Sequence, residues 1–128
     1  MARFLLACAV AHLAVSAAHG VSHAALGIWP SAAEGVFIAV AVYALPAVAI
    51  LTRGRVGSWL LAAGLAGSLV FGLHHHFLAV SPDHVAHLPA GPFRLPFQAT
   101  AAASVPIDAA GLVASLVALW RGDGWRRG

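Results

Sequence analysis

The sequence predicts an all-α integral membrane protein, in which four helices form a single-domain membrane bundle. Of its 128 residues, 61% are hydrophobic and only 9% are charged, whereas soluble domains carry about 25% charged residues. The apolar residues fall into four runs long enough to cross a bilayer, separated by turns rich in proline, glycine or arginine. We expect the spans at residues 3–28, 32–51, 57–80 and 97–120.

The first run, residues 3–28, continues without a formal charge from Arg3 to Trp29. Trp29 suits a membrane interface and Pro30 blocks further helix, so we expect the helix to end there. Residues 1–18 also fit a cleaved signal peptide, because a basic residue precedes an apolar stretch and small residues. We expect this segment to be retained, because the apolar character continues past the cleavage position.

Three histidines lie within this first span, at His12, His19 and His23. Their separations are seven and four residues. At about 100° per residue, the three imidazoles fall within roughly 40° of one another around the helix axis. Ser16 shares this stripe. The run is therefore a spanning helix with one histidine stripe, to which the other helices can supply partners.

The second span begins with Ser31 and Glu34, which have the spacing of a capping box that closes the first turn of a helix. Pro46 lies inside the span and should kink it. Tyr43 lies nine residues after Glu34, which places it on the opposite side of a regular helix. We therefore expect Tyr43 to face lipid or another subunit.

The third span carries small residues at every fourth position, at Gly64, Ser68 and Gly72. Small residues at this spacing let two membrane helices approach closely. His75 and His76 fall near the same face, three and four residues after the last glycine, whereas His74 points elsewhere.

The fourth span follows the one sizeable loop, which carries His84 and His87. Pro106 interrupts this span, and Asp108 lies well inside it. An ionisable group at the centre of a membrane helix costs about 2.5–3.5 kcal/mol on insertion scales. Asp108 therefore needs a partner or a bound cation.

The arginines set the expected orientation. With four spans, one side carries Arg3, Arg53, Arg55, Arg121, Arg126 and Arg127, and the other carries only Arg94. The positive-inside rule then places both termini in the cytoplasm and the histidine loop on the outer side, which we expect to be that of a bacterial inner membrane. The formal charge of +3 does not indicate nucleic-acid binding, because the few basic residues lie where topology requires them.

The polar residues converge toward the outer half of the predicted bundle. At about 1.5 Å per residue, His19 and Asp108 both lie roughly 15 Å deep. The remaining candidates lie roughly 5–9 Å from the outer end: His23, Glu34, His75 and His76. Imidazole and carboxylate groups that project inward from several helices can build a metal centre. We predict a transition metal site, with Zn, Fe or Mn favoured and Cu possible.

The candidate ligands are His19, His23, Glu34, His75 and His76. Asp108 would be a further ligand or would orient His19 from behind. His12, His84 and His87 are secondary candidates, in a path toward the cytoplasm or in the loop above the site. Redox, hydrolytic and metal-handling uses of the ion are not separable at this stage, so enzymatic activity stays undetermined.

Two other functions remain open. A b-type haem could be held between one histidine of the first span and one of the third, from the set His19, His23, His75 and His76. Alternatively, the polar groups only tie the helices together, and the chain is a small structural subunit of a larger membrane complex. A homo-oligomer or a membrane complex is expected in each case, because thin, glycine-rich spans leave small-residue faces unmatched.

Overall fold

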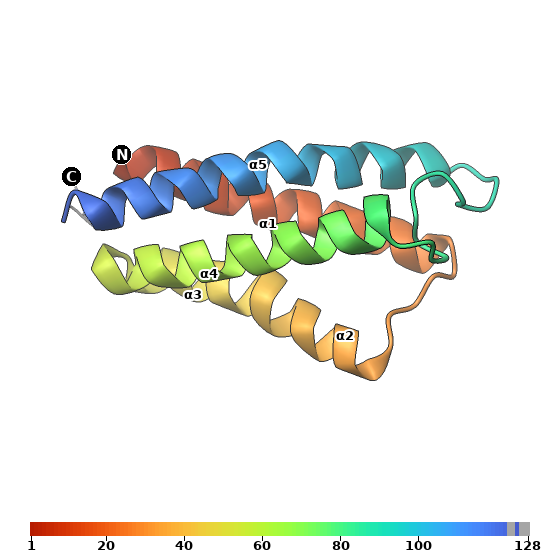
Figure 1. The fold of residues 1–128 in the computed structure, drawn as a ribbon, viewed down its shortest axis with the longest axis horizontal. Coiled ribbons are helices and arrows are strands. Elements are labelled where there is room, and N and C mark those ends of the chain that lie inside the picture. The colour runs from red at the N-terminus through yellow and green to blue at the C-terminus, as the bar shows by residue number, and fades with distance from the viewer. Residues whose placement is uncertain (123–124, 126–128) are drawn as a thin grey trace.

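The computed structural model describes residues 1–122 and 125, and within them all regular secondary structure is helical. Arg126 and Arg127, which contribute to the predicted orientation, lie outside the described residues. The elements, shown in Figure 1, are α1 (Ala2–Ala25), α2 (Ala32–Phe37), the π-helix η1 (Ile38–Ala44), α3 (Leu45–Thr52), α4 (Gly54–Leu73), the π-helix η2 (His74–Leu78) and α5 (Arg94–Trp120).

Four continuous helices are long and apolar enough to cross a membrane: Ala2–Ala25, Ala32–Thr52, Gly54–Leu78 and Arg94–Trp120. This confirms the all-α class and the prediction of four helices with the length and apolar character of membrane spans. The first span ends three residues earlier than predicted, and the fourth begins three residues earlier. Helix α1 begins and α5 ends at the same end of the bundle (Figure 1), which we call the terminal end. The opposite end, formed by residues 26–31 and 79–93, is the loop end.

Helix α1 ends before the predicted Trp-Pro pair because Gly27 stops it. Gly27 adopts a left-handed conformation with φ of 69°, and its N–H donates to the Ala24 carbonyl at 3.1 Å. The next N–H, of Ile28, donates to the carbonyl of His23, also at 3.1 Å. These two bonds form a Schellman motif, the common glycine-dependent end of a helix. The motif fixes the backbone of His23 at the loop end.

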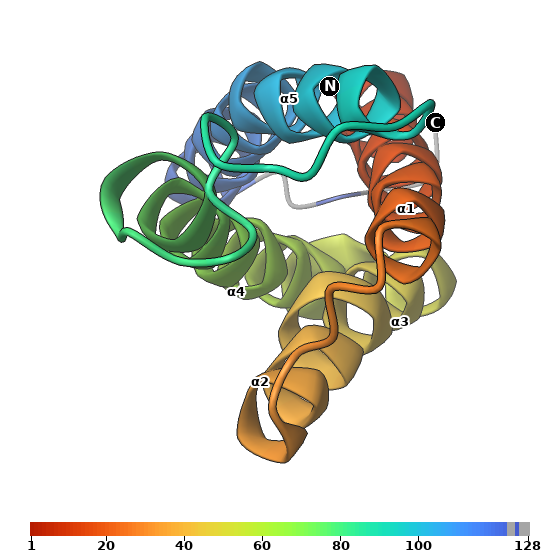
Figure 2. The same ribbon diagram turned by 90° about the vertical axis from the view of Figure 1, so that its right-hand side faces the viewer.

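The second span begins with the predicted capping box. The Ser31 N–H donates to Glu34 Oε2 at 2.7 Å, and the Glu34 N–H donates to Ser31 Oγ at 3.3 Å. From this cap, α2 diverges from α1 and α4, whereas its continuation α3 packs against α4 (Figure 2). The divergence separates α1 from the second span toward the loop end.

The π-helix η1 lies just before Pro46, where the sequence predicts a kink. Pro46 has no N–H and cannot donate to the carbonyl of Val42, and the wider turns of a π-helix accommodate this defect. Because each π-helical residue turns the chain by less than an α-helical residue does, Tyr43 does not end up opposite Glu34. Its hydroxyl donates to the carbonyl of Ser16 on α1 at 2.9 Å. The expectation that Tyr43 faces lipid or another subunit is therefore wrong.

The spans pack most closely toward the terminal end. A buried apolar cluster there joins α1, α3, α4 and α5, and consists of Leu5, Ala9, Ala49, Leu61, Leu65, Ala114, Ala118 and Trp125. A Cβ on Gly64 would lie 2.8 Å from Pro46 Cδ and 2.9 Å from the carbonyl oxygen of Ala41. Gly64 thus gives the close approach that the small-residue pattern predicts. Ser68 and Gly72, farther along the same face, line a cavity instead.

Candidate metal centre

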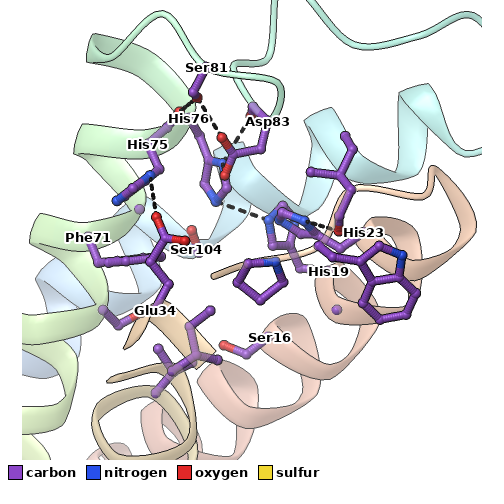
Figure 3. A pocket seen from close by; sticks show the side chains of 18 of the residues that line it. Ser16, His19, His23, Glu34, Phe71, His75, His76, Ser81, Asp83 and Ser104 are labelled. Carbon is purple, nitrogen blue, oxygen red and sulfur yellow. Dashed lines mark hydrogen bonds and ion pairs between the residues drawn. The ribbon is translucent and has the colours of Figure 1, made fainter. Parts of the chain in front are cut away.

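Three histidine side chains converge near the loop end, as Figure 3 shows. His19 and His23 come from α1, and His76 comes from η2. One ligand nitrogen from each lies within 4.8 Å of the other two. Phe97, fully buried on α5, packs against all three imidazoles at ring-centroid distances of 4.4, 4.7 and 5.3 Å. The rings therefore have little freedom to turn away from one another.

The Nδ1 atom of each imidazole is directed at an oxygen. His76 Nδ1 lies 3.1 Å from the Asp83 carbonyl, and His23 Nδ1 lies 3.4 Å from the Ile28 carbonyl. A carbonyl only accepts, so in both pairs Nδ1 carries the proton and donates. His19 Nδ1 lies 2.9 Å from the Thr100 hydroxyl.

The hydroxyl of Thr100 is already committed to its own helix. It donates to the carbonyl of Pro96 at 2.7 Å and lies 3.0 Å from that of Phe97. When its single proton is used there, Thr100 Oγ1 accepts from His19 Nδ1. All three histidines then have the proton on Nδ1 and a lone pair on Nε2, the tautomer that a neutral ligand histidine needs when its other nitrogen is oriented by a hydrogen bond.

The two nearest Nε2 atoms, of His19 and His76, lie only 3.1 Å apart. This is a hydrogen-bond distance, so in the absence of an ion one Nε2 carries a proton and donates to the other; for His19 this requires Thr100 to donate to His19 Nδ1. A shared cation would take the place of that proton. Two imidazole ligands of a tetrahedral zinc ion have nitrogens roughly 3.3 Å apart, at Zn–N bonds of about 2.0–2.1 Å. The spacing is thus close to that of a ligand pair, and a modest inward shift of His23 completes a set of three.

The loop after η2 folds over His76, the third candidate ligand. The N–H of Val85 donates to the His76 carbonyl at 3.0 Å, while the carboxylate of Asp83 lies 3.6 Å from His76 Nδ1. Ser81 Oγ donates to this carboxylate and lies 3.1 Å from the His75 carbonyl. A loop carboxylate therefore stands directly behind a candidate ligand, where it can balance part of the charge of a bound cation.

A cavity of about 710 Å³ adjoins the three histidines. Its wall includes α1, η1, α4 and the two connections of the loop end. Glu34 and His75 lie across this cavity from His19 (Figure 3). Glu34 Oε1 and His75 Nδ1 are 3.8 Å apart, and the ring of Phe71 lies against His75 at 4.1 Å. This second pair is not part of the three-histidine group.

Asp108 lies deeper than the cluster and pairs with His12. His12 Nδ1 is 2.7 Å from Asp108 Oδ1, and both side chains are at most 1% exposed. The sequence suggested a contact with His19 instead. The difference follows from the helix ends: counted from Ala25 and Arg94, His12 and Asp108 both lie roughly 20 Å deep, whereas His19 lies only about 9 Å deep.

The remaining histidines do not join the cluster. His84 and His87 stack on each other in the loop, with ring centroids 4.7 Å apart. Both nitrogens of His84 are engaged, one accepting from the N–H of Ala86 at 3.2 Å and one 3.3 Å from the Phe77 carbonyl. His74 is exposed on the outside of η2. These residues are not positioned to act as ligands alongside His19.

Sequence reasoning missed Thr100, Phe97 and the carbonyl of Asp83 as supports of the site. Thr100 looks like any threonine that bonds back to its own helix, and only the tertiary contact with His19 gives it a second role. Gly27, in contrast, carried a readable signal, since a glycine after a helical run marks a helix end. That signal would have placed His23 at the end of the first helix.

Comparisons with protein-family models, with curated proteins and with solved structures give no match for this chain. Its function is therefore inferred from the geometry of this site.

Proposed function

We propose that this chain is a membrane protein that binds and exchanges a divalent transition metal ion, with Zn²⁺ the best match, through His19, His23 and His76. Three imidazoles with a fourth position toward a cavity resemble the open zinc sites in which water or another ligand completes the tetrahedron. Since Glu34 and Asp108 lie outside the cluster, the donors are all nitrogen, which favours zinc or copper over manganese.

The orientation of the three Nδ1 atoms is the observation that carries this proposal. Each is directed at a hydroxyl or carbonyl oxygen outside the cluster, so each Nε2 can present a lone pair to a bound ion. Such outward partners fix the tautomer and ring orientation of metal-ligating histidines. An interhelical hydrogen bond alone is worth about 0.6 kcal/mol on average in one membrane protein. That gain does not account for three supported imidazoles meeting at one point.

The same distances favour an ion over haem. An iron between two axial nitrogens needs them about 4 Å apart, with the porphyrin plane passing between them. The Nε2 atoms of His19 and His76 are 3.1 Å apart, and Phe97 occupies the side of the cluster next to all three rings. A porphyrin would have to displace this fully buried side chain.

Metal exchange suits the position of the site better than redox chemistry does. Zinc has no redox chemistry, and the cluster lies beside a large cavity bordered by both connections of the loop end. We further propose that the loop end faces the outside of a bacterial inner membrane, because Arg3, Arg53 and Arg55 belong to the terminal end. Large exposed apolar side chains such as Leu51, 78% exposed, would then contact lipid or a second subunit.

The test is the metal content of two adjacent variants, measured by elemental mass spectrometry on protein purified in mild detergent without a histidine tag. His76→Ala removes a ligand, so bound metal should fall from about one ion per chain to near zero, since a site reduced to two ligands holds the ion poorly. His74→Ala is the matched control, because His74 lies two residues away on the same π-helix but outside the cluster. Equal metal content in wild type and His76→Ala would refute the site.

A further inference from the structure

The buried pair of His12 and Asp108 has an arrangement that helix packing alone does not require. His12 Nε2 lies 2.8 Å from the carbonyl of Val42, an acceptor without its usual helical donor because Pro46 has no N–H. Nε2 therefore donates, and His12 Nδ1 faces Asp108 Oδ1 at 2.7 Å. One proton must lie between these two atoms, because without it a lone pair would face a carboxylate oxygen.

The pair with its shared proton is electrically neutral. If the proton is on His12, an imidazolium faces a carboxylate, and if it is on Asp108, a neutral imidazole faces a carboxyl group. Loss of the proton leaves one negative charge at a site where both side chains are at most 1% exposed. Burial of an unbalanced charge is costly. The pair therefore holds its proton until a positive charge arrives nearby.

A bound dication supplies that positive charge. His12 and His19 are seven residues apart on α1, which places the metal site roughly 10 Å from the pair. At an effective dielectric constant near 20, two positive charges at that distance lower the affinity of the pair for its proton roughly 250-fold. The three ligand histidines are neutral in their binding form, so they do not offset this effect.

The geometry points to a proton-binding site at His12 and Asp108 that releases its proton when a divalent cation binds to the three histidines. This inference rests on the proposed function. The bond that breaks is the one between the pair and the shared proton, and the proton passes to water in the cavity. Two residues connect the pair to that cavity, because both line its wall: Val42 and Ser104. The carbonyl of Val42 contacts His12, and Ser104 lies one turn from Asp108.

A further observation marks Asp108 as having an acceptor atom that the helix packing does not use. Within the described residues, its Oδ2 atom is buried and has no hydrogen-bond partner. Other ionisable groups near the pair are few: Cys8 lies one turn away on α1, and Tyr43 is on η1. Helix α3 and the stretch 57–73 of α4 contribute none, and α5 contributes only Asp108 between residues 95 and 120. The pair is thus the main group in this part of the bundle that can lose a proton in response to the charge of the ion.

The experiment counts protons released per zinc ion, with zinc chloride added to detergent-purified protein in weak buffer at about pH 7.5, above the ordinary histidine pKa. Asp108→Asn is nearly isosteric. The asparagine amide can donate to His12 Nδ1 while His12 Nε2 still donates to the Val42 carbonyl, but the variant pair holds no releasable proton. This variant should still bind zinc and should release up to one proton fewer per ion than wild type. Because zinc binding and proton release are linked, the zinc affinity of wild type should rise with pH. In Asp108→Asn the rise should be less steep, by up to a factor of ten per pH unit.

Two further variants complete the design. Ser68→Ala changes the same cavity wall without removing a charge, and it should release as many protons as wild type. The double variant His12→Leu with Asp108→Leu replaces the pair by apolar side chains, a change that often leaves stability intact, and it should lose the same proton as Asp108→Asn. Zinc binding with equal proton release in all variants would overturn the coupling alone. Absence of zinc binding by wild type would overturn the proposed function and the coupling with it.

Discussion

Toward the terminal end, the four helices close around an apolar cluster, and the polar pair above it, His12 and Asp108, is joined by a hydrogen bond of 2.7 Å. Toward the loop end, three histidines present their Nε2 atoms to one another beside a cavity of about 710 Å³. The two halves belong to the same helices. What separates them is the divergence of α2, which the π-helix η1 and its following proline permit. Close packing thus forces polar groups to pair, whereas a gap leaves them free to bind a ligand.

Two glycines on α4 test this contrast on one helix. At Gly64 a Cβ would meet Pro46 Cδ at 2.8 Å and a backbone oxygen at 2.9 Å, whereas at Gly72 its nearest neighbour would be His76 Cδ2 at 3.9 Å. Gly64→Ala should therefore lower the free energy of unfolding by about 1–3 kcal/mol, the usual cost of overpacking. Gly72→Ala should leave it unchanged or raise it slightly, because alanine favours helix.

Denaturant titration of both variants in the same detergent gives the comparison. A loss of stability at Gly72 as large as that at Gly64 would mean that the loop end is packed as closely as the terminal end. The cavity, and the open coordination position that the proposed site requires, would then be in doubt.

Regular features of the chain were predictable because they depend on local sequence. The four spans follow from apolar runs of the required length, and the capping box of Ser31 and Glu34 forms as its spacing predicts. The close approach at Gly64 also follows from a pattern of small residues. These features need no knowledge of neighbouring helices, or only that a neighbour is present.

The partners of each polar group were harder to predict, because they depend on small offsets between helices. An error of three residues in the ends of α1 and α5 was enough to pair Asp108 with His19 instead of His12. The π-helix η1 changed the direction of Tyr43, and η2 contains both His75, which faces Glu34, and His76, which enters the cluster. A prediction that assumes regular α-helix geometry cannot reproduce these changes in side-chain direction.

Thr100 tests whether the loop end is organised to bind a metal ion. Thr100→Val keeps the shape of the side chain but removes the oxygen that accepts from His19 Nδ1. Zinc affinity should fall about 10- to 100-fold, as is typical when the outer partner of a ligand histidine is lost. Ser104→Ala is the control on the same helix, because within the described residues its hydroxyl bonds to the Ala101 carbonyl and to no histidine. Competition with a calibrated zinc chelator measures the zinc affinity of both variants. Equal affinities of Thr100→Val and Ser104→Ala would mean that Thr100 does not orient His19.

Tyr43 lies where the two halves meet, and it should show the smallest effect. Its hydroxyl joins η1 to α1 through the carbonyl of Ser16, and it lines the cavity without reaching the three histidines. Tyr43→Phe removes one interhelical hydrogen bond, so the free energy of unfolding should fall by about 0.6 kcal/mol. Zinc affinity should be unchanged, because no ligand loses its partner. A fall in zinc affinity comparable with that of Thr100→Val would show instead that the closed half positions the ligands of the open half, and that the two halves act as one unit.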